Sequence, residues 1–210
     1  MDALETIKIP EPDESLLDIN EGLNRFLPAP SFNLFLEQTI LDEDHFLFNE
    51  EHLHLAKATI GFLWTNAPNT RQMKRIVGTA EMPLFRGNRW QKARQEQQLE
   101  QWFGLQPDFL ITFDATFWAE SNAAERLCVF EHELYHCAQA RDAWGLPRFS
   151  RRTGKPIFAM RGHDIENFVG VIRRYGAKAS GQDTVDFVNA AMQEPLIMEA
   201  GISALCGTCL

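Results

Sequence analysis

The sequence predicts an α+β domain in which a small mixed sheet packs against helices. Apolar segments rich in strand-forming residues alternate with segments whose apolar residues recur at helical spacing. Hydrophobic residues make up 45% of the 210 residues and include 16 Phe and 5 Trp, which is enough to fill a buried core. No segment reaches the roughly 18 apolar residues that cross a membrane, so we expect no membrane contact.

Residues 1–30 are expected to form an acidic, poorly structured arm, followed by one domain over residues 31–210. Four prolines and many carboxylates disfavour a packed core in the arm. Residues 1–60 contain 13 acidic and 3 basic residues, whereas the whole chain has a net charge of −9. The first 20 residues do not contain the basic segment and apolar run of a secretion signal. We therefore expect a cytoplasmic location.

The elements of the predicted domain begin with a short helix that Ser31 can cap. A second helical stretch ends at residues 53–58. Two strands are predicted next, at residues 60–65 and 75–82, because both segments are apolar and rich in strand formers. A turn signal, residues 66–69, follows the first of them.

The middle of the chain predicts a helix, a strand and a second helix. Apolar residues recur at helical spacing over residues 90–103, and Gly104 can end this helix. Apolar and polar residues alternate over residues 108–118, which is the best strand candidate. A helix over about residues 123–141 follows, capped by the serine or asparagine just before it.

The last third predicts a hairpin and two helices. Two short apolar stretches, residues 148–150 and 157–160, flank a Gly-Pro turn and indicate a β-hairpin. Asp164 is expected to cap a helix that runs through Arg174. Another helix is predicted over residues 184–200.

The chemistry of the chain centres on the segment His132-Glu133-Leu134-Tyr135-His136. Positions i and i+4 share one face of a helix, so both imidazoles can bind one ion at about 2.0–2.1 Å. Zinc lowers the pKa of a bound water towards about 7, and Glu133 can then accept its proton. This HExxH pattern is typical of zincins, so we predict a Zn²⁺ cofactor bound by His132 and His136 and a catalytic Glu133.

A catalytic zinc usually has three protein ligands. His163 is the first candidate for the third, because a hairpin can bring it back to the motif. Glu166 is the rival ligand or a residue that orients a ligand. Asp164 is expected to cap a helix or to orient a ligand. We expect surface positions for the histidines of the acidic region, which are His45, His52 and His54.

The four cysteines are expected to be reduced thiols. Cys128 and Cys137 flank the motif and are interpreted as buried and inert. Cys206 and Cys209 have CxxC spacing, which fits redox chemistry or half a zinc site. Because no second pair accompanies them, we favour a frayed or packed end of the chain.

Several of these segments resemble the putative phage metallopeptidase family of zincins. The resemblance spans about residues 60–176 and rests on residues 60–65, 76–81, 108–112, 131–136, 163–168 and 174–176. It implies a compact zincin-like metalloprotease domain and a zinc site of the HExxH pair plus a residue of the His163–Glu166 segment. It also implies a phage or prophage origin, and so the host cytoplasm. Glu131 and Asn167 stand where that family is expected to have Asp and Glu.

The expected function is hydrolysis of peptide bonds in protein or peptide substrates, with Glu133 as the general base. Tyr135, Tyr175 and Arg161 are unranked candidates to stabilise the oxyanion. The order of elements is also similar to that of SprT-like proteases, which act on DNA-bound proteins. Residues 141–174 contain eight basic and three acidic residues, so nucleic-acid contact through residues 148–161 is a second expectation.

Two other functions stay open. The first is a non-catalytic interaction protein that binds a host protein or nucleic acid, in which four protein ligands close a structural zinc site. The second is an amidase or deformylase, which would also use HExxH. We find no upstream segment that supplies the cysteine ligand expected of a deformylase.

Overall fold

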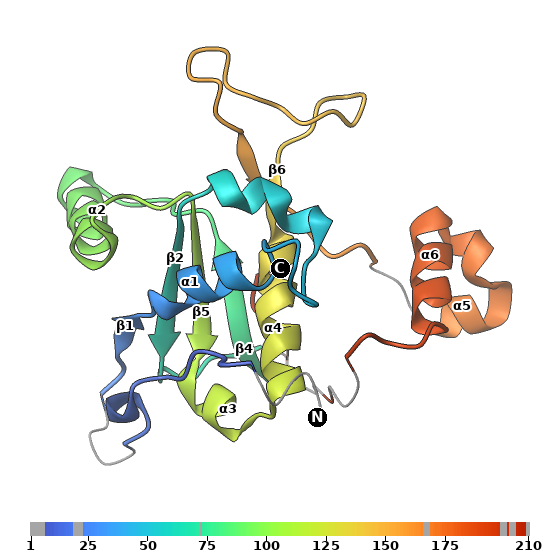
Figure 1. Ribbon diagram of the computed structural model, residues 1–210, viewed down its shortest axis with the longest axis horizontal. Helices are drawn as coiled ribbons and strands as arrows, with labels where there is room; N and C mark the ends of the chain where they lie inside the picture. The colour runs from blue at the N-terminus through green and yellow to red at the C-terminus, as the bar shows by residue number, and fades with distance from the viewer. Residues whose placement is uncertain are drawn as a thin grey trace.

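The fold is α+β, as predicted: a six-stranded mixed sheet with helices against it (Figure 1). The computed structural model describes residues 7–18, 23–71, 73–165, 169–197, 201 and 205–208. The sheet has the order β1-β2-β5-β4-β3, and β8 pairs with β4. The strands are β1 Phe26–Pro28, β2 Ile60–Thr65, β3 Thr70–Arg71, β4 Lys74–Glu81, β5 Phe109–Asp114 and β8 Leu205–Cys206.

The two central pairs of the sheet differ in direction: β2 is parallel to β5, and β5 is antiparallel to β4. All residues of β2 are buried, which explains its nearly uninterrupted apolar sequence. The strands predicted at residues 60–65 and 75–82 are confirmed to within one residue.

Helices lie on both faces of the sheet. The helices of the described structure are η2 Glu14–Leu16, α1 Ser31–Gln38, η4 Glu50–Lys57, α2 Arg89–Phe103, α3 Ala115–Glu120, α4 Ala123–His136, α5 Val169–Tyr175, η5 Ala177–Ser180 and α6 Gln182–Ala191, of which α5, η5 and α6 stand to one side of the sheet (Figure 1). Leu99 of α2 packs against Leu63 and Leu110 on one face. The other face carries the main core, to which α1 and α4 contribute. The predicted stop at Gly104 is confirmed, with a φ of 72°.

Phe32 of α1 is the centre of the main core. Its ring centroid lies 5.0–5.3 Å from those of five other rings, which belong to Phe62, Trp64, Phe113, Trp118 and Phe130. Phe130 belongs to α4, so this cluster attaches the helix with the HExxH motif to the sheet. The metal-ligand candidates on α4 therefore stand on a rigid, packed support.

The strand predicted over residues 108–118 ends at Asp114, and its last part is the helix α3. The Asp114 carboxylate accepts hydrogen bonds from the backbone N–H groups of Thr116 and Phe117, which caps this helix. It also accepts two bonds from the Arg75 guanidinium, at 2.7 and 2.8 Å. The capping carboxylate thus stops the strand where residue alternation alone would continue it.

Replacing Asp114 by Ala is expected to lower the free energy of unfolding by about 2 kcal/mol, because it removes a helix cap and both hydrogen bonds that the Arg75 guanidinium donates to the carboxylate. Urea denaturation measures this change. Glu120→Ala is the control, because Glu120 lies 3.7 Å from the same guanidinium but is exposed. Equal stabilities of the two variants would contradict the assignment.

The helix predicted over residues 123–141 begins where expected but ends at His136. Asn122 and Glu125 form a capping box at its start. After His136 the chain enters β6 Cys137–Gln139, which pairs antiparallel with β7 Phe158–Met160. The backbone groups of residues 137–139 therefore form hydrogen bonds across the hairpin instead of within a longer helix. Tertiary structure overrides the local helical preference here.

The predicted hairpin is correct only in part: residues 158–160 pair with residues 137–139, and residues 148–150 contribute a single bridge, between Phe149 and Pro156. A second bridge, between Arg141 and Pro147, closes a loop between the end of β6 and this segment. The helix expected to begin at Asp164 is described from Val169, and the helix expected over residues 184–200 is α6, which ends at Ala191. Asp164 pairs with Arg161 at 2.6 Å, and its role as a helix cap stays a prediction, because residues 166–168 lie outside the described residues.

The described residues of the predicted arm lie against the domain instead of forming a poorly structured segment. Ile9 and Leu16 are buried, and the Trp118 indole donates a hydrogen bond to the Pro10 carbonyl at 2.9 Å. Burial of these apolar side chains offsets the cost of ordering a proline-rich segment. That residues 31–210 form a single domain stays a prediction.

Among the described residues, no helix is long and apolar enough to cross a membrane.

Candidate metal centre

Helix α4 presents the HExxH residues beside the sheet, and it packs against β4. Its buried face includes Leu127, Phe130 and Leu134, which anchor it in the core. Glu133 and His136 are buried on the same helix, and His132 is half-buried. The helical period therefore places both imidazoles at the edge of the core.

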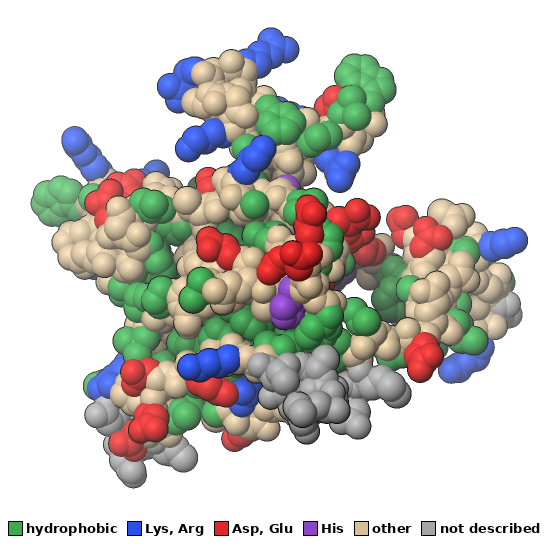
Figure 2. All heavy atoms as spheres, viewed as in Figure 1, with side chains coloured by type: hydrophobic (Ala, Val, Ile, Leu, Met, Phe, Trp, Pro, Cys, Tyr) green, Lys and Arg blue, Asp and Glu red, His purple; other side chains and the backbone are tan. Residues whose placement is uncertain are grey.

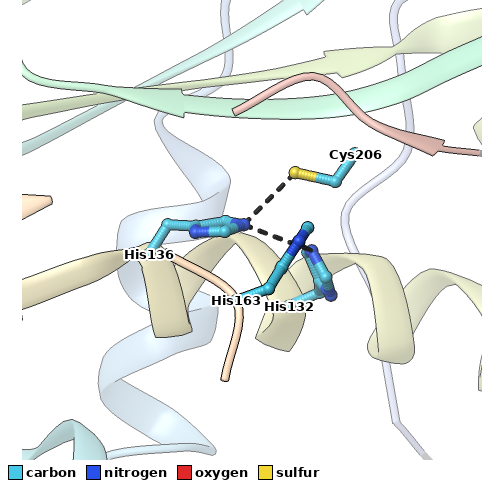
Figure 3. Close-up of side chains that lie close together, drawn as sticks. All are labelled: His132, His136, His163 and Cys206. Carbon is cyan, nitrogen blue, oxygen red and sulfur yellow. Dashed lines mark hydrogen bonds between the residues drawn. The ribbon is translucent and has the colours of Figure 1, made fainter. Parts of the chain in front are cut away.

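Three histidines converge at this point (Figure 3). His132 Nε2 lies 3.2 Å from His136 Nε2 and 3.1 Å from His163 Nε2. The hairpin returns the chain to α4, as expected for His163, which is exposed. The tertiary structure thus brings together the three residues that the sequence suggested as metal ligands.

The hairpin also orients His136. The Arg161 carbonyl oxygen lies 2.7 Å from His136 Nδ1, and the Arg161 N–H donates to the His136 carbonyl at 2.9 Å. A proton on Nδ1 that is donated to this carbonyl leaves the lone pair of Nε2 for a metal ion. Pairing of the chain with itself just after the motif therefore places the Arg161 carbonyl against the His136 ring.

Cys206 is a fourth member of the cluster, contrary to our expectation of a frayed or packed end. Its Sγ lies 3.2 Å from His136 Nε2, and the four ligand atoms lie within 4.8 Å of one another. Pairing of β8 with β4 carries Cys206 to this place. Spacing along the sequence does not indicate this contact, because Cys206 is 70 residues from His136.

The donor set fits zinc. A tetrahedron with zinc–nitrogen distances of about 2.0–2.1 Å has edges of about 3.3 Å, close to the two measured distances between imidazole nitrogens. Three imidazoles and one thiolate are ligand types that zinc prefers. Burial alone would raise the pKa of the Cys206 thiol, but hydrogen bonds with His132, His136 and Thr208 outweigh it and lower the pKa to about 4.

Glu133 lies beside the cluster with its side chain 1% exposed. Burial raises the pKa of its carboxyl to about 8, and the Cys206 thiolate adds to this increase. Its Oε2 accepts a hydrogen bond from the Thr208 hydroxyl at 2.9 Å. A Cβ atom at Gly78 of β4 would lie 2.7 Å from Glu133 Oε1 and 2.9 Å from its Cγ, so a side chain at this position would displace the carboxylate.

Other candidate residues lie elsewhere. Asp164 pairs with Arg161 outside the cluster, and Glu166 and Cys209 lie outside the described residues. Of the two cysteines expected to be buried, Cys137 is buried but Cys128 is exposed.

Two histidines of the acidic region were expected at the surface but are not surface residues. His52 is buried, with Nε2 3.6 Å from Glu131 Oε1. His54 is half-buried, and its Nε2 lies 2.6 Å from the Cys137 carbonyl oxygen. Both support the end of α4 from η4, a long-range contact that local composition does not reveal.

The basic residues between β6 and β7 lie on the long connection of this hairpin, which projects from the rest of the structure (Figure 2). Arg148, Arg151, Arg152 and Lys155 are exposed on it. Trp144 and Leu146 are also exposed there.

A model of the family described as "Putative phage metallopeptidase" matches residues 34–192. The match covers most of the chain and includes the HExxH motif and His163. The chain belongs to this family. No curated protein and no solved structure matches it.

Membership in the phage metallopeptidase family implies a metal ion, and the cluster of three histidines and Cys206 is a group that can hold one. It also implies protein or peptide substrates. The family description does not mention nucleic acid, so contact through residues 148–161 is not supported by it and stays a prediction.

Proposed function

We propose that this protein is a zinc-dependent metallopeptidase in which His132, His136 and His163 bind the metal and Glu133 is the general base. The observation that carries the proposal is that the Nε2 atoms of His136 and His163 lie 3.2 and 3.1 Å from that of His132, beside a buried carboxylate. When bound there, zinc would polarise a scissile carbonyl and lower the pKa of a water molecule, so that the water can lose a proton and attack the carbonyl near neutral pH.

The residues of the chain supply positioning and proton transfer. Glu133 holds its carboxylate against Gly78, where it can accept a proton from the attacking water and pass it to the leaving amine. Arg161 orients His136 through its backbone carbonyl. β4 offers backbone hydrogen-bonding groups to an extended peptide beside the metal site.

Metal analysis of purified protein tests the proposal. We expect about one zinc per chain in the wild type and in His45→Ala, which removes a histidine outside the cluster. Loss of a residue that only hydrogen-bonds to a metal ligand lowers metal affinity by roughly 10–100-fold. His163→Ala is expected to lower the zinc affinity by more than this, because it removes a ligand. The wild type should also cleave casein in a chelator-sensitive way.

Two results would change the assignment. Loss of zinc from Glu166→Ala with retention in His163→Ala would make Glu166 the third ligand. Failure of the wild type to take up zinc would refute the metallopeptidase proposal.

A second candidate function is a non-catalytic, zinc-stabilised interaction protein. The position of Cys206 favours it, because a fourth protein ligand occupies the place that a catalytic zinc usually keeps for water. A protein that binds one zinc per chain but cleaves nothing, even after Cys206→Ala, would support this function instead.

A further inference from the structure

Residues 205–208, which we call the closing segment, lie along β4 directly over the candidate metal centre. Leu205 pairs with Ile76 and Cys206 with Gly78 in a parallel register. The Gly207 N–H donates to the Gly78 carbonyl at 2.9 Å, and the Ala80 N–H donates to the Thr208 hydroxyl at 2.6 Å. The segment thus uses the backbone groups that β4 would offer to a bound peptide.

The same segment contacts both chemical parts of the site. Cys206 Sγ lies 3.2 Å from His136 Nε2, and the Thr208 hydroxyl donates to Glu133 Oε2 at 2.9 Å. The Thr208 N–H also donates to Cys206 Sγ, at 3.2 Å. A thiolate held in this way can fill the fourth position of a zinc ion, while Thr208 engages the carboxylate that should receive a proton.

The fit of the segment is close. A Cβ atom at Gly207 would lie 2.4 Å from Thr79 Cγ2 and 2.7 Å from Ile76 Cγ2. Both of these methyl groups belong to β-branched side chains of β4, which have little rotamer freedom to move aside. Gly207 is therefore required for the segment to lie on the strand, and a substitution there can release it without removing the thiol.

We propose that the closing segment is a built-in inhibitor, in which Cys206 is the fourth zinc ligand and residues 205–208 occupy the peptide-binding edge of β4. This inference rests on the proposed metallopeptidase function. The family match ends at residue 192, so the closing segment is a feature of this chain outside the matched residues. Peptide substrate and closing segment compete for the same strand edge, so the bound segment slows cleavage by the wild type without abolishing it.

The ligand assignment is tested without measuring activity. The Co²⁺ complex of the wild type is expected to show a thiolate-to-cobalt absorption band in the near ultraviolet, which Cys206→Ala lacks and Gly207→Ala weakens. Zinc should slow iodoacetamide alkylation of Cys206 at least about tenfold, as the ligating thiolate is no longer free to react. Alkylation of the exposed Cys128, followed by peptide mass spectrometry in the same sample, is the internal standard.

Inhibition is tested by casein hydrolysis with zinc-loaded proteins. Cys206→Ala and Gly207→Ala are each expected to cleave at least tenfold faster than the wild type, with circular dichroism confirming that both variants are folded. Identical cobalt spectra in wild type and Cys206→Ala, or equal alkylation of Cys206 with and without zinc, would overturn the proposal. Equal cleavage by all three proteins would overturn inhibition and leave the peptidase function standing. Zinc binding without cleavage by any of them would overturn the peptidase function itself.

Discussion

Glu133→Gln is expected to lower the peptidase turnover rate by about 10²–10⁴-fold while zinc binding persists. Glutamine has nearly the same shape, so it fits against Gly78 and can still accept the hydrogen bond from Thr208. It cannot accept a proton from water near neutral pH, which is the role proposed for the carboxylate. Turnover of casein and zinc content, measured in the wild-type and the Cys206→Ala backgrounds, separate the two effects.

Glu131→Gln is the matched control for this experiment. Glu131 lies on the same helix but accepts a hydrogen bond from Asn49 at 2.8 Å and does not belong to the cluster. Its replacement is expected to leave turnover within a few-fold of the parent protein. Unchanged turnover in Glu133→Gln would refute the general-base role.

Phe32→Ala is expected to destabilise the fold by about 3–5 kcal/mol, because it opens a cavity among five aromatic rings that cannot collapse without moving α1 or α4. Urea denaturation followed by tryptophan fluorescence measures the loss. The same substitution is also expected to weaken zinc binding, because Phe130 on the ligand-bearing helix stacks directly on Phe32.

Leu34→Ala is the control, because Leu34 lies on the same helix but is 55% exposed. Its effect is expected to stay within about 0.5 kcal/mol. A similar loss in both variants would mean that α1 contributes through helix stability instead of through the ring cluster.

The sequence alone determined the features that depend on neighbouring residues. Burial of β2 follows from its apolar run, and the start of α4 follows from the pair of capping residues before it, of which the structure uses Asn122. The shared face of His132 and His136 follows from the helical period. The sequence also predicted that residues 157–160 form one arm of a hairpin, but not that residues 137–139 form the other, because these were expected to be helical.

Only the tertiary structure decided the contacts between residues far apart in the chain. Helix α4 ends at His136 because the backbone beyond it pairs with β7, although the local sequence favours a longer helix. Cys206 reaches His136 because β8 pairs with β4, and no local signal encodes a pairing across 70 residues. Local preferences act within a few residues, whereas the fourth ligand and the occupied strand edge depend on how the whole chain closes on itself.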